Sequence, residues 1–210
     1  MNRIDSLNNA KASRQLVLGS TSKYRRELLA RLQIPFDVAA PDVDETPLPG
    51  EAPQTMAMRL ALAKAHAVAA EFPNAIVIGS DQVADLNGLP LGKPGTHERA
   101  AEQLKMMRGR MVFFRTAVAV VCKATGFAQS DLAAVRVRFR DLSDHEIERY
   151  LRIEQPYDCA GSAKSEGLGI ALLAAIESDD PTALVGLPLI RTCNLLRAAG
   201  LDVLSREAAA

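Results

Sequence analysis

The chain has 210 residues, of which 48% are hydrophobic and 24% charged, the composition of an ordinary globular protein long enough to bury a full core. Its 25 basic and 25 acidic residues leave a formal net charge of zero, so no overall field draws it to nucleic acid or to an anionic membrane. We therefore expect neither as a partner. Any phosphate chemistry must depend on a local cluster of cations.

The cysteines and the lack of long apolar segments predict a cytoplasmic protein. Cys122, Cys159 and Cys193 are odd in number, far apart and without Cys-x-x-Cys spacing, which favours free thiols over disulfides or a zinc site. The N-terminal segment has no apolar stretch typical of a signal peptide. No run approaches the roughly 18 apolar residues of a membrane span.

Residues 16–32, LVLGSTSKYRRELLARL, predict a strand, a turn and a helix capped by Ser22. Arg25 and Arg26 fall in the first helical turn, although a helix N-terminus already carries about half a positive charge. Each arginine should cost a few tenths to about 1 kcal/mol there unless an anion joins it. With Tyr24 beside them, the helix tip is either an anion-binding site or a helix whose arginines turn into water.

The next segments bring two further charged side chains to a loop and to a helix. Residues 36–54 are rich in Pro, Asp and Glu, too polar for a core element, and place Glu45 on a loop. A helix should begin at Pro53 and run to about Phe72. Lys64 lies within its alanine-rich part.

An apolar strand, AIVIG, follows and ends near Asp81, at the kind of strand end where open α/β sheets bind ligands. The simpler interpretation is that Asp81 caps a turn by accepting backbone N–H groups. Asn87-Gly88 is the strongest hairpin signal in the chain. Thr96 should then cap a helix that Gly109 closes.

The second half of the chain alternates strands and helices. In chain order we expect strands at 111–121 and 127–140, a helix from the Ser143/Glu146 capping box to about Ile153, a strand at 167–176, and a helix from Pro188 to Gly200. Because strands arrive both as hairpins and across helices, the sheet should be mixed. We predict an α/β (mixed α+β) fold, with one two-lobed domain at 15–204 around a central cleft and flexible tails at 1–14 and 205–210.

Several basic residues stand in loops or on mostly apolar faces rather than on a plainly solvated surface: Arg25, Arg26, Lys64, Lys93 and Lys164. Lysines and forked arginines match the oxygens of a compact triphosphate, so we expect this set to contact such a substrate. A carboxylate such as Asp81 amid these cations suggests hydrolysis, either as a base that takes a proton from water or as a metal ligand. Zinc protease, serine hydrolase and Walker loop motifs are absent from the sequence.

Six motifs occur in order between about Gln15 and Val203: LVLGSTSKYRRELL, PDVDETP, RLALAKA, VIGSDQV, LGKP, and YDCAGSAKSEGLG with LVGLPL. Together they resemble the Maf-like nucleoside triphosphate pyrophosphatases. The resemblance implies cleavage of the α,β-phosphate bond of a nucleoside triphosphate, which gives a nucleoside monophosphate and diphosphate. It also implies a divalent cation, Mg²⁺ or Mn²⁺, a homodimer, and a two-lobed mixed α/β fold with a cleft.

The resemblance also assigns roles to residues of this chain. Asp81 matches the family's proposed base, and Glu45 would lie near the metal with it. The residues that would hold the triphosphate are Ser20, Ser22, Arg25, Arg26, Lys64 and Lys93. Two positions depart from the family pattern: Ala63 stands where Glu is usual, which removes one possible metal or lysine partner, and Lys23 stands where Pro is common, which adds a cation.

Tyr24, Asp81-Gln82 and Glu166 resemble the branch of the family that hydrolyses 7-methyl-GTP. Methylation at N7 makes guanine a cation, on which the Tyr24 ring can stack with a gain of about 0.5 to 2 kcal/mol. Glu166 could accept the adjacent N1–H and 2-amino donors of guanine, and Gln82 could position the ribose or the base. Alternatively, Tyr24 staples the helix to the core and Glu166 belongs to a surface turn.

Two other functions stay open. One is a dTTP or UTP pyrophosphatase of the same family, which would differ in its base pocket. The other is a nucleotide-binding regulator of cell division without significant turnover. Release of diphosphate would separate an enzyme from a sensor, and the preferred base would separate the two branches.

Overall fold

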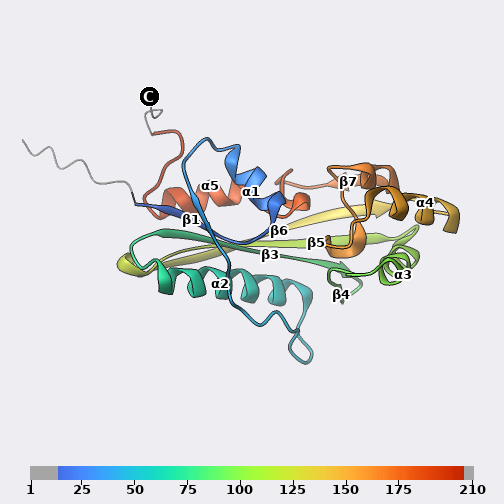
Figure 1. The fold of residues 1–210 in the computed structure, drawn as a ribbon, viewed down its shortest axis with the longest axis horizontal. Coiled ribbons are helices and arrows are strands. Elements are labelled where there is room, and N and C mark those ends of the chain that lie inside the picture. Colours follow the sequence, from blue (N-terminus) through green and yellow to red (C-terminus); the bar gives the residue numbers. More distant parts are fainter. Residues whose placement is uncertain (1–13, 206–210) are drawn as a thin grey trace, which may run out of the picture.

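The computed structural model describes residues 14–205, which fold around a seven-stranded mixed sheet flanked by helices (Figure 1). The strands are β1 (Leu16–Gly19), β2 (Asp37–Ala39), β3 (Ile76–Leu86), β4 (Leu89–Leu91), β5 (Met111–Cys122), β6 (Phe127–Phe139) and β7 (Leu173–Glu177). The α-helices are α1 (Lys23–Ala30), α2 (Pro53–Glu71), α3 (His97–Met107), α4 (Asp144–Glu154) and α5 (Leu189–Ala198). The predicted mixed α/β fold is confirmed.

The strands follow the order β2-β1-β3-β5-β6-β7, and β4 pairs with β3 off this path. β1 is parallel to β2 and β3, because α1 and α2 carry the chain back across the sheet between them. The pairs β3–β5, β5–β6 and β6–β7 are antiparallel. The sheet therefore has a parallel half and an antiparallel half, as the mixture of hairpins and helical connections predicts.

Side chains alternate between the two faces of the central strands, so each face buries its own core. Ile78 of β3 and Val120 of β5 belong to the core with α1 and α5, whereas Val77 and Ala119 belong to the core with α2. Figure 1 shows α2 on the opposite face of the sheet from α1 and α5. A third core packs α3 and α4 against the beginning of β5 and the end of β6.

Local signals in the sequence are confirmed at helix ends and at the hairpin. Ser22 Oγ accepts a hydrogen bond from the Arg25 N–H, and Ser143 with Glu146 forms both hydrogen bonds of a capping box. Asn87 and Gly88, at φ 53° and 88°, connect β3 to β4. Positive φ at both central residues is what a tight hairpin turn requires.

The predicted strand at 167–176 is wrong in its first half, where the chain forms a 3₁₀ helix from Leu168 to Leu172 before β7 begins. Glu154 Oε2 accepts a hydrogen bond from the Leu168 N–H at 2.7 Å. Gly169 packs against the Lys164 backbone so closely that a Cβ would collide with it. These two contacts hold the chain in a tight turn, which an extended strand could not make.

β3 does not end at Asp81, as the apolar run suggests, but continues to Leu86. The reason is that β5 pairs with it without a break from Val77 to Asp85. The acidic segment at 36–54 also differs slightly from the predicted loop, because it contributes the short exposed strand β2 at the edge of the sheet.

Of the predicted tails, residues 1–13 and 206–210 lie outside the described residues, and the domain boundaries stay predictions. Cys122, Cys159 and Cys193 are free thiols, as their spacing predicts. None of the helices among residues 14–205 combines the length and the apolar character that crossing a membrane requires.

Gly79 allows α2 to lie directly on β3, because a Cβ at this position would collide with the backbone of Ala61 and Ala65. We expect Gly79→Ala to lower the free energy of unfolding by about 1 to 3 kcal/mol, the usual cost of overpacking, as measured by urea denaturation. Gly92→Ala is the matched control: nothing lies within 4 Å of its Cβ, so stability should change by less than about 0.5 kcal/mol. Equal stability of the two variants would contradict close packing at Gly79.

Candidate active site

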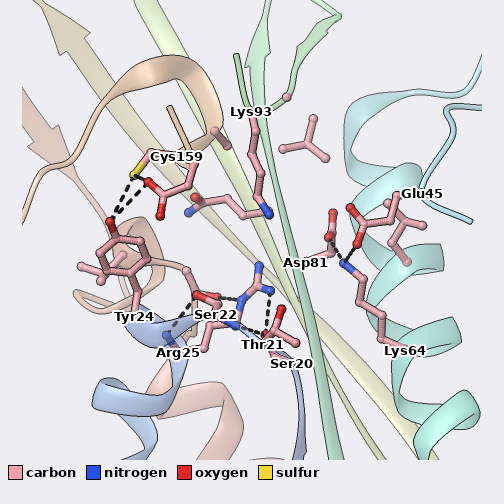
Figure 2. Close-up of a pocket in the computed structure, with 18 of the residues that line it drawn as sticks. Ser20, Thr21, Ser22, Tyr24, Arg25, Glu45, Lys64, Asp81, Lys93 and Cys159 are labelled. Carbon is pink, nitrogen blue, oxygen red and sulfur yellow. Dashed lines mark hydrogen bonds and ion pairs between the residues drawn. The ribbon is translucent and has the colours of Figure 1, made fainter. Parts of the chain in front are cut away.

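A cavity of about 630 Å³ opens where β1 ends beside β3 (Figure 2). β1 stops at Gly19, which pairs with Gly79, while β3 runs on through Asp81. Between these paired glycines and the residues that pair with β4, the edge of β3 that faces β1 therefore has no neighbouring strand among the described residues, which leaves room for the cavity. The other walls come from the tip of α1, from α2, and from the loops that follow β2, β4, α4 and β7. This volume suits a small-molecule ligand.

The structure brings most of the predicted site residues to this cavity. Its lining includes Ser20, Ser22, Tyr24, Arg25, Glu45, Lys64, Asp81, Gln82, Lys93 and Glu166. Arg26 and Lys164 are not among the lining residues. Arg26 is exposed, since one residue along an α-helix turns by about 100° away from its neighbour Arg25. Lys164 is paired with Glu154 instead.

Lys64 holds two carboxylates together at the inner side of the cavity, an arrangement that we call the Lys64 bridge. Its ammonium donates to Asp81 Oδ1 at 2.7 Å and lies 2.6 Å from Glu45 Oε1. Lys64 and Asp81 are 5% and 7% exposed, whereas the Glu45 side chain is 55% exposed. Partial burial works to raise the pKa of Glu45, but the hydrogen bond and charge of Lys64, helped by Lys93 and Arg25, lower it overall. Glu45 is therefore ionised at neutral pH.

Arg25 is held from two sides at the tip of α1. Its Nε donates to Gly186 O at 2.9 Å, and one terminal nitrogen donates to Ser20 Oγ at 3.3 Å. Burial lowers the pKa of this guanidinium, against the opposing charges of Asp81 and Glu45. An anion entering the cavity would favour the charged form of the guanidinium. The two hydrogen bonds already orient Arg25, so the residue that conflicts with the helix dipole is ready to bind an anionic ligand.

The two sides of the cavity differ in chemistry. Figure 2 shows Tyr24 and Cys159 on one side and the Lys64 bridge on the other. The side chains of Arg25 and Lys93 reach into the space between them. A ligand that spans the cavity would therefore meet an aromatic ring at one end, cations in the middle and a buried carboxylate at the other end.

The aromatic end contains two residues that sequence reasoning did not select, Asp158 and Cys159. The Tyr24 hydroxyl donates to Asp158 Oδ1 at 3.4 Å, and the Cys159 thiol donates to the Tyr24 oxygen at 3.8 Å. Burial and then nearby negative groups raise the pKa of Tyr24 and raise that of Cys159 to about 12, so both are neutral at pH 7. Burial also raises the pKa of Glu166. The sequence offered one signal for Asp158 and Cys159: they lie in the same glycine-containing segment, YDCAGSAKSEG, as the predicted site residue Glu166.

Gln82 lines the cavity with its amide group already anchored. Its Nε2 donates to Thr116 Oγ1 at 2.9 Å and to the backbone oxygens of Ala183 and Leu184, both at 3.0 Å. These acceptors fix which end of the amide is nitrogen, because a flipped amide would place two oxygens against each other. Oε1 is therefore the atom that Gln82 offers to a ligand, as a hydrogen-bond acceptor.

Asp81 and Glu45 fit a divalent cation as part of its ligand set. Carboxylate oxygens suit Mg²⁺ and Mn²⁺, and Mg²⁺ is commonly held by one or two carboxylates with substrate phosphates and water. Among residues 14–205, no group of three or more His, Cys, Asp and Glu side chains could hold a metal on its own. Ala63 supplies no ligand, so a phosphate-bearing ligand would have to complete the site.

Comparisons with known proteins find relatives along most of the chain. The family model described as Maf, Maf-like protein, matches residues 15–199. A protein of Polaromonas sp. called 7-methyl-GTP pyrophosphatase is 77% identical, over 90% of this chain and 86% of that protein. Proteins of the same name from Albidiferax ferrireducens and Methylobacillus flagellatus are 71% and 59% identical, over 91% and 90% of this chain and 96% and 98% of theirs.

A solved structure, that of the Staphylococcus aureus Ham1 protein, overlaps with part of the fold. It covers 61% of this chain and 73% of its own, at 19% identity and a TM-score of 0.45. Because this overlap is weak, family membership rests on the sequence matches.

Lys64→Met should expose the dependence of the fold on the Lys64 bridge. Removing the ammonium leaves the Asp81 carboxylate buried without its cation, so we expect the free energy of unfolding to fall by about 3 kcal/mol in urea denaturation. Adding Asp81→Asn removes the orphaned charge and should recover most of that loss. A Lys64→Met protein within about 0.5 kcal/mol of the unmodified one would show that the bridge contributes little to stability.

Proposed function

This chain belongs to the family of Maf-like proteins, and from that premise we propose that it is a nucleoside triphosphate pyrophosphatase whose substrate is 7-methyl-GTP. The products are 7-methyl-GMP and diphosphate, and the reaction removes a modified nucleotide. The names of its relatives support this activity. The observation that carries it is the cavity in which Arg25 and Lys93 stand between an aromatic ring and the buried carboxylate of Asp81.

The triphosphate binds along the cationic middle of the cavity. The Arg25 guanidinium and the Lys93 ammonium supply charge-assisted hydrogen bonds, which are stronger than neutral ones. The hydroxyl groups of Ser20 and Ser22, at the tip of α1, line the same region. Binding relieves the unfavourable burial of Arg25, because the phosphate oxygens replace the water that this guanidinium has lost.

Asp81 acts as the general base. Lys64 holds its Oδ1, which leaves Oδ2 to accept a proton from a water molecule. The water oxygen bonds to the α-phosphorus while the bond from that phosphorus to the α,β-bridging oxygen breaks, and diphosphate leaves with the bridging oxygen. Arg25 and Lys64 stabilise the negative charge that grows on the phosphate oxygens during this step.

A divalent cation, Mg²⁺ or Mn²⁺, belongs to the proposal as well. Glu45 and Asp81 would hold it together with substrate phosphates, in keeping with their oxygen donors. When bound, the ion neutralises phosphate charge and polarises a phosphoryl oxygen. Lys64 would then keep the carboxylates of Asp81 and Glu45 in place through its contacts with both.

The aromatic end of the cavity receives the methylated base. The guanine ring of 7-methyl-GTP is a cation, and Tyr24 offers it a π face. The carboxylates of Asp158 and Glu166 lie in the same part of the cavity and add negative charge. Unmethylated guanine lacks the positive charge and loses this attraction. Separately, Gln82 Oε1 accepts a hydrogen bond from the ribose or the base.

We also propose that the protein is a cytoplasmic homodimer that binds neither nucleic acid nor membranes. Free thiols at Cys122, Cys159 and Cys193 favour a reducing compartment. The formal net charge of zero argues against attraction to polyanions. The dimer follows from the family resemblance.

Asp81→Asn tests the general base. It keeps the shape of the side chain and an oxygen for Lys64 but accepts no proton, so kcat should fall by about 10² to 10⁴-fold while nucleotide binding survives. Diphosphate release measures kcat, and calorimetry measures binding. Near-normal turnover of this variant would disprove the role of Asp81. A protein that binds nucleotide without turnover even when unmodified would instead be the regulatory sensor.

The preferred base is tested with a panel of 7-methyl-GTP, GTP, dTTP and UTP in the presence of Mg²⁺ or Mn²⁺. We expect the highest kcat/KM for 7-methyl-GTP, with its advantage over GTP reduced about 2- to 30-fold by Tyr24→Ala, since a cation–π contact is worth about 0.5 to 2 kcal/mol. Tyr24→Phe keeps the aromatic face and is the matched control.

Glu166→Gln should lower kcat/KM for guanine nucleotides with kcat on the best substrate retained. Equal or better hydrolysis of dTTP or UTP would place the protein in the pyrimidine branch.

A further inference from the structure

The loop that follows β7 supplies main-chain oxygens to two side chains that line the cavity. Gly186 O accepts the hydrogen bond of Arg25 Nε at 2.9 Å. The oxygens of Ala183 and Leu184 accept those of Gln82 Nε2, each at 3.0 Å. The direction of an arginine that faces the phosphates and of an amide that faces the base therefore depends on the position of this loop.

The loop is fastened to the start of α5 by the side chains of Asp180 and Thr182, which together we call the α5 clasp. Asp180 Oδ2 accepts a hydrogen bond from the Arg191 N–H at 3.1 Å, and Thr182 Oγ1 accepts one from the Leu189 N–H at 2.8 Å. Leu189 and Arg191 are the first and third residues of α5, whose own N-cap residue, Pro188, makes no side-chain cap. The clasp therefore performs the capping from the loop itself.

The burial of Asp180 makes this attachment rigid. The residue is 0% exposed, its Oδ1 lies 3.1 Å from Thr182 Oγ1, and its Oδ2 lies 3.7 Å from a terminal nitrogen of Arg191. A buried carboxylate is costly unless its oxygens are hydrogen-bonded and its charge is paired. Any displacement of the loop that breaks these contacts leaves an uncompensated charge, so the loop carbonyls are held in one position.

We propose that Asp180 is a positioning residue for triphosphate binding: through the α5 clasp it fixes Gly186 O, and Gly186 O aims the Arg25 guanidinium into the cavity. Asp180 itself touches no ligand. It acts on the phosphates only by way of Arg25, so its effect must disappear when Arg25 is absent. The inference rests on the proposed function only in taking Arg25 as a phosphate ligand.

A double-mutant cycle of ligand binding tests this dependence. Calorimetry measures the dissociation constants of inorganic triphosphate and of 7-methyl-GTP with a methylene group in place of the α,β-bridging oxygen. Asp180→Ala should weaken the binding of both by about 10- to 100-fold, because a misplaced binding group loses most of its effect. In a protein that already carries Arg25→Ala, the same change should weaken the binding of inorganic triphosphate, which has no base or ribose for Gln82 to contact, by less than about threefold.

Two further variants separate positioning from general damage to the fold. Asp179→Ala is the matched control, because Asp179 also pairs with Arg191, at 3.0 Å, but its side chain is 72% exposed. The affinities of the Asp179→Ala variant for both ligands should stay within about twofold of those of the unmodified protein. Asp180→Asn keeps an acceptor for the Arg191 N–H and should recover most of the affinity, and a loss as large as that of Asp180→Ala would overturn capping as the cause.

Equal losses from Asp180→Ala with and without Arg25 would overturn the proposal, and so would an unmodified protein that binds neither ligand. If Asp180→Ala does not fold, as judged by circular dichroism, Thr182→Val replaces it in the cycle, and unchanged affinity in that variant would also overturn the proposal. If the unmodified protein binds both ligands but releases no diphosphate from 7-methyl-GTP, the proposed enzymatic function fails while the positioning role of Asp180 stands.

Discussion

The buried ammonium of Lys64 constrains the structure around the cavity. At 5% exposure this charge needs partners within hydrogen-bond distance, and the two carboxylates of the Lys64 bridge supply them. For a side chain of α2 to reach β3 in this way, the helix must lie directly on the sheet. Ala61, Ala65 and Gly79 permit that approach because none of them places a large side chain at the contact. The small residues of one core thus bring the charged groups of the cavity together.

Much of the fold and part of the site could be predicted because their signals are local. Helix ends at Ser22 and Ser143 follow from hydrogen bonds within one turn, and Asn87-Gly88 suffices to fix a hairpin. Arg25 was predicted to face a ligand because it conflicts with the helix dipole, a conflict that requires no knowledge of distant residues. The ordered motifs of the family carried the rest of the assignment, including Glu45, which no local pattern indicates.

Other features depend on contacts between distant segments, which leave little trace in the sequence. Arg26 and Lys164 have the right charge, but charge alone does not give direction, and neither lines the cavity. Gly186 orients Arg25 with a backbone oxygen, a group that every residue has, and Asp180 caps a helix that begins several residues later. In each case the decisive partner is chosen by the tertiary fold rather than by a neighbour in the chain.

The proposed function requires that a cavity with an aromatic end, a cationic middle and a buried carboxylate cuts 7-methyl-GTP between its α- and β-phosphates. Phosphorus NMR of 7-methyl-GTP incubated with the protein and Mg²⁺ tests it most directly, because each phosphate of substrate and products gives its own signal. The predicted result is the appearance of 7-methyl-GMP and diphosphate in equal amounts. Formation of 7-methyl-GDP with orthophosphate, or a triphosphate that stays intact, would contradict the claim.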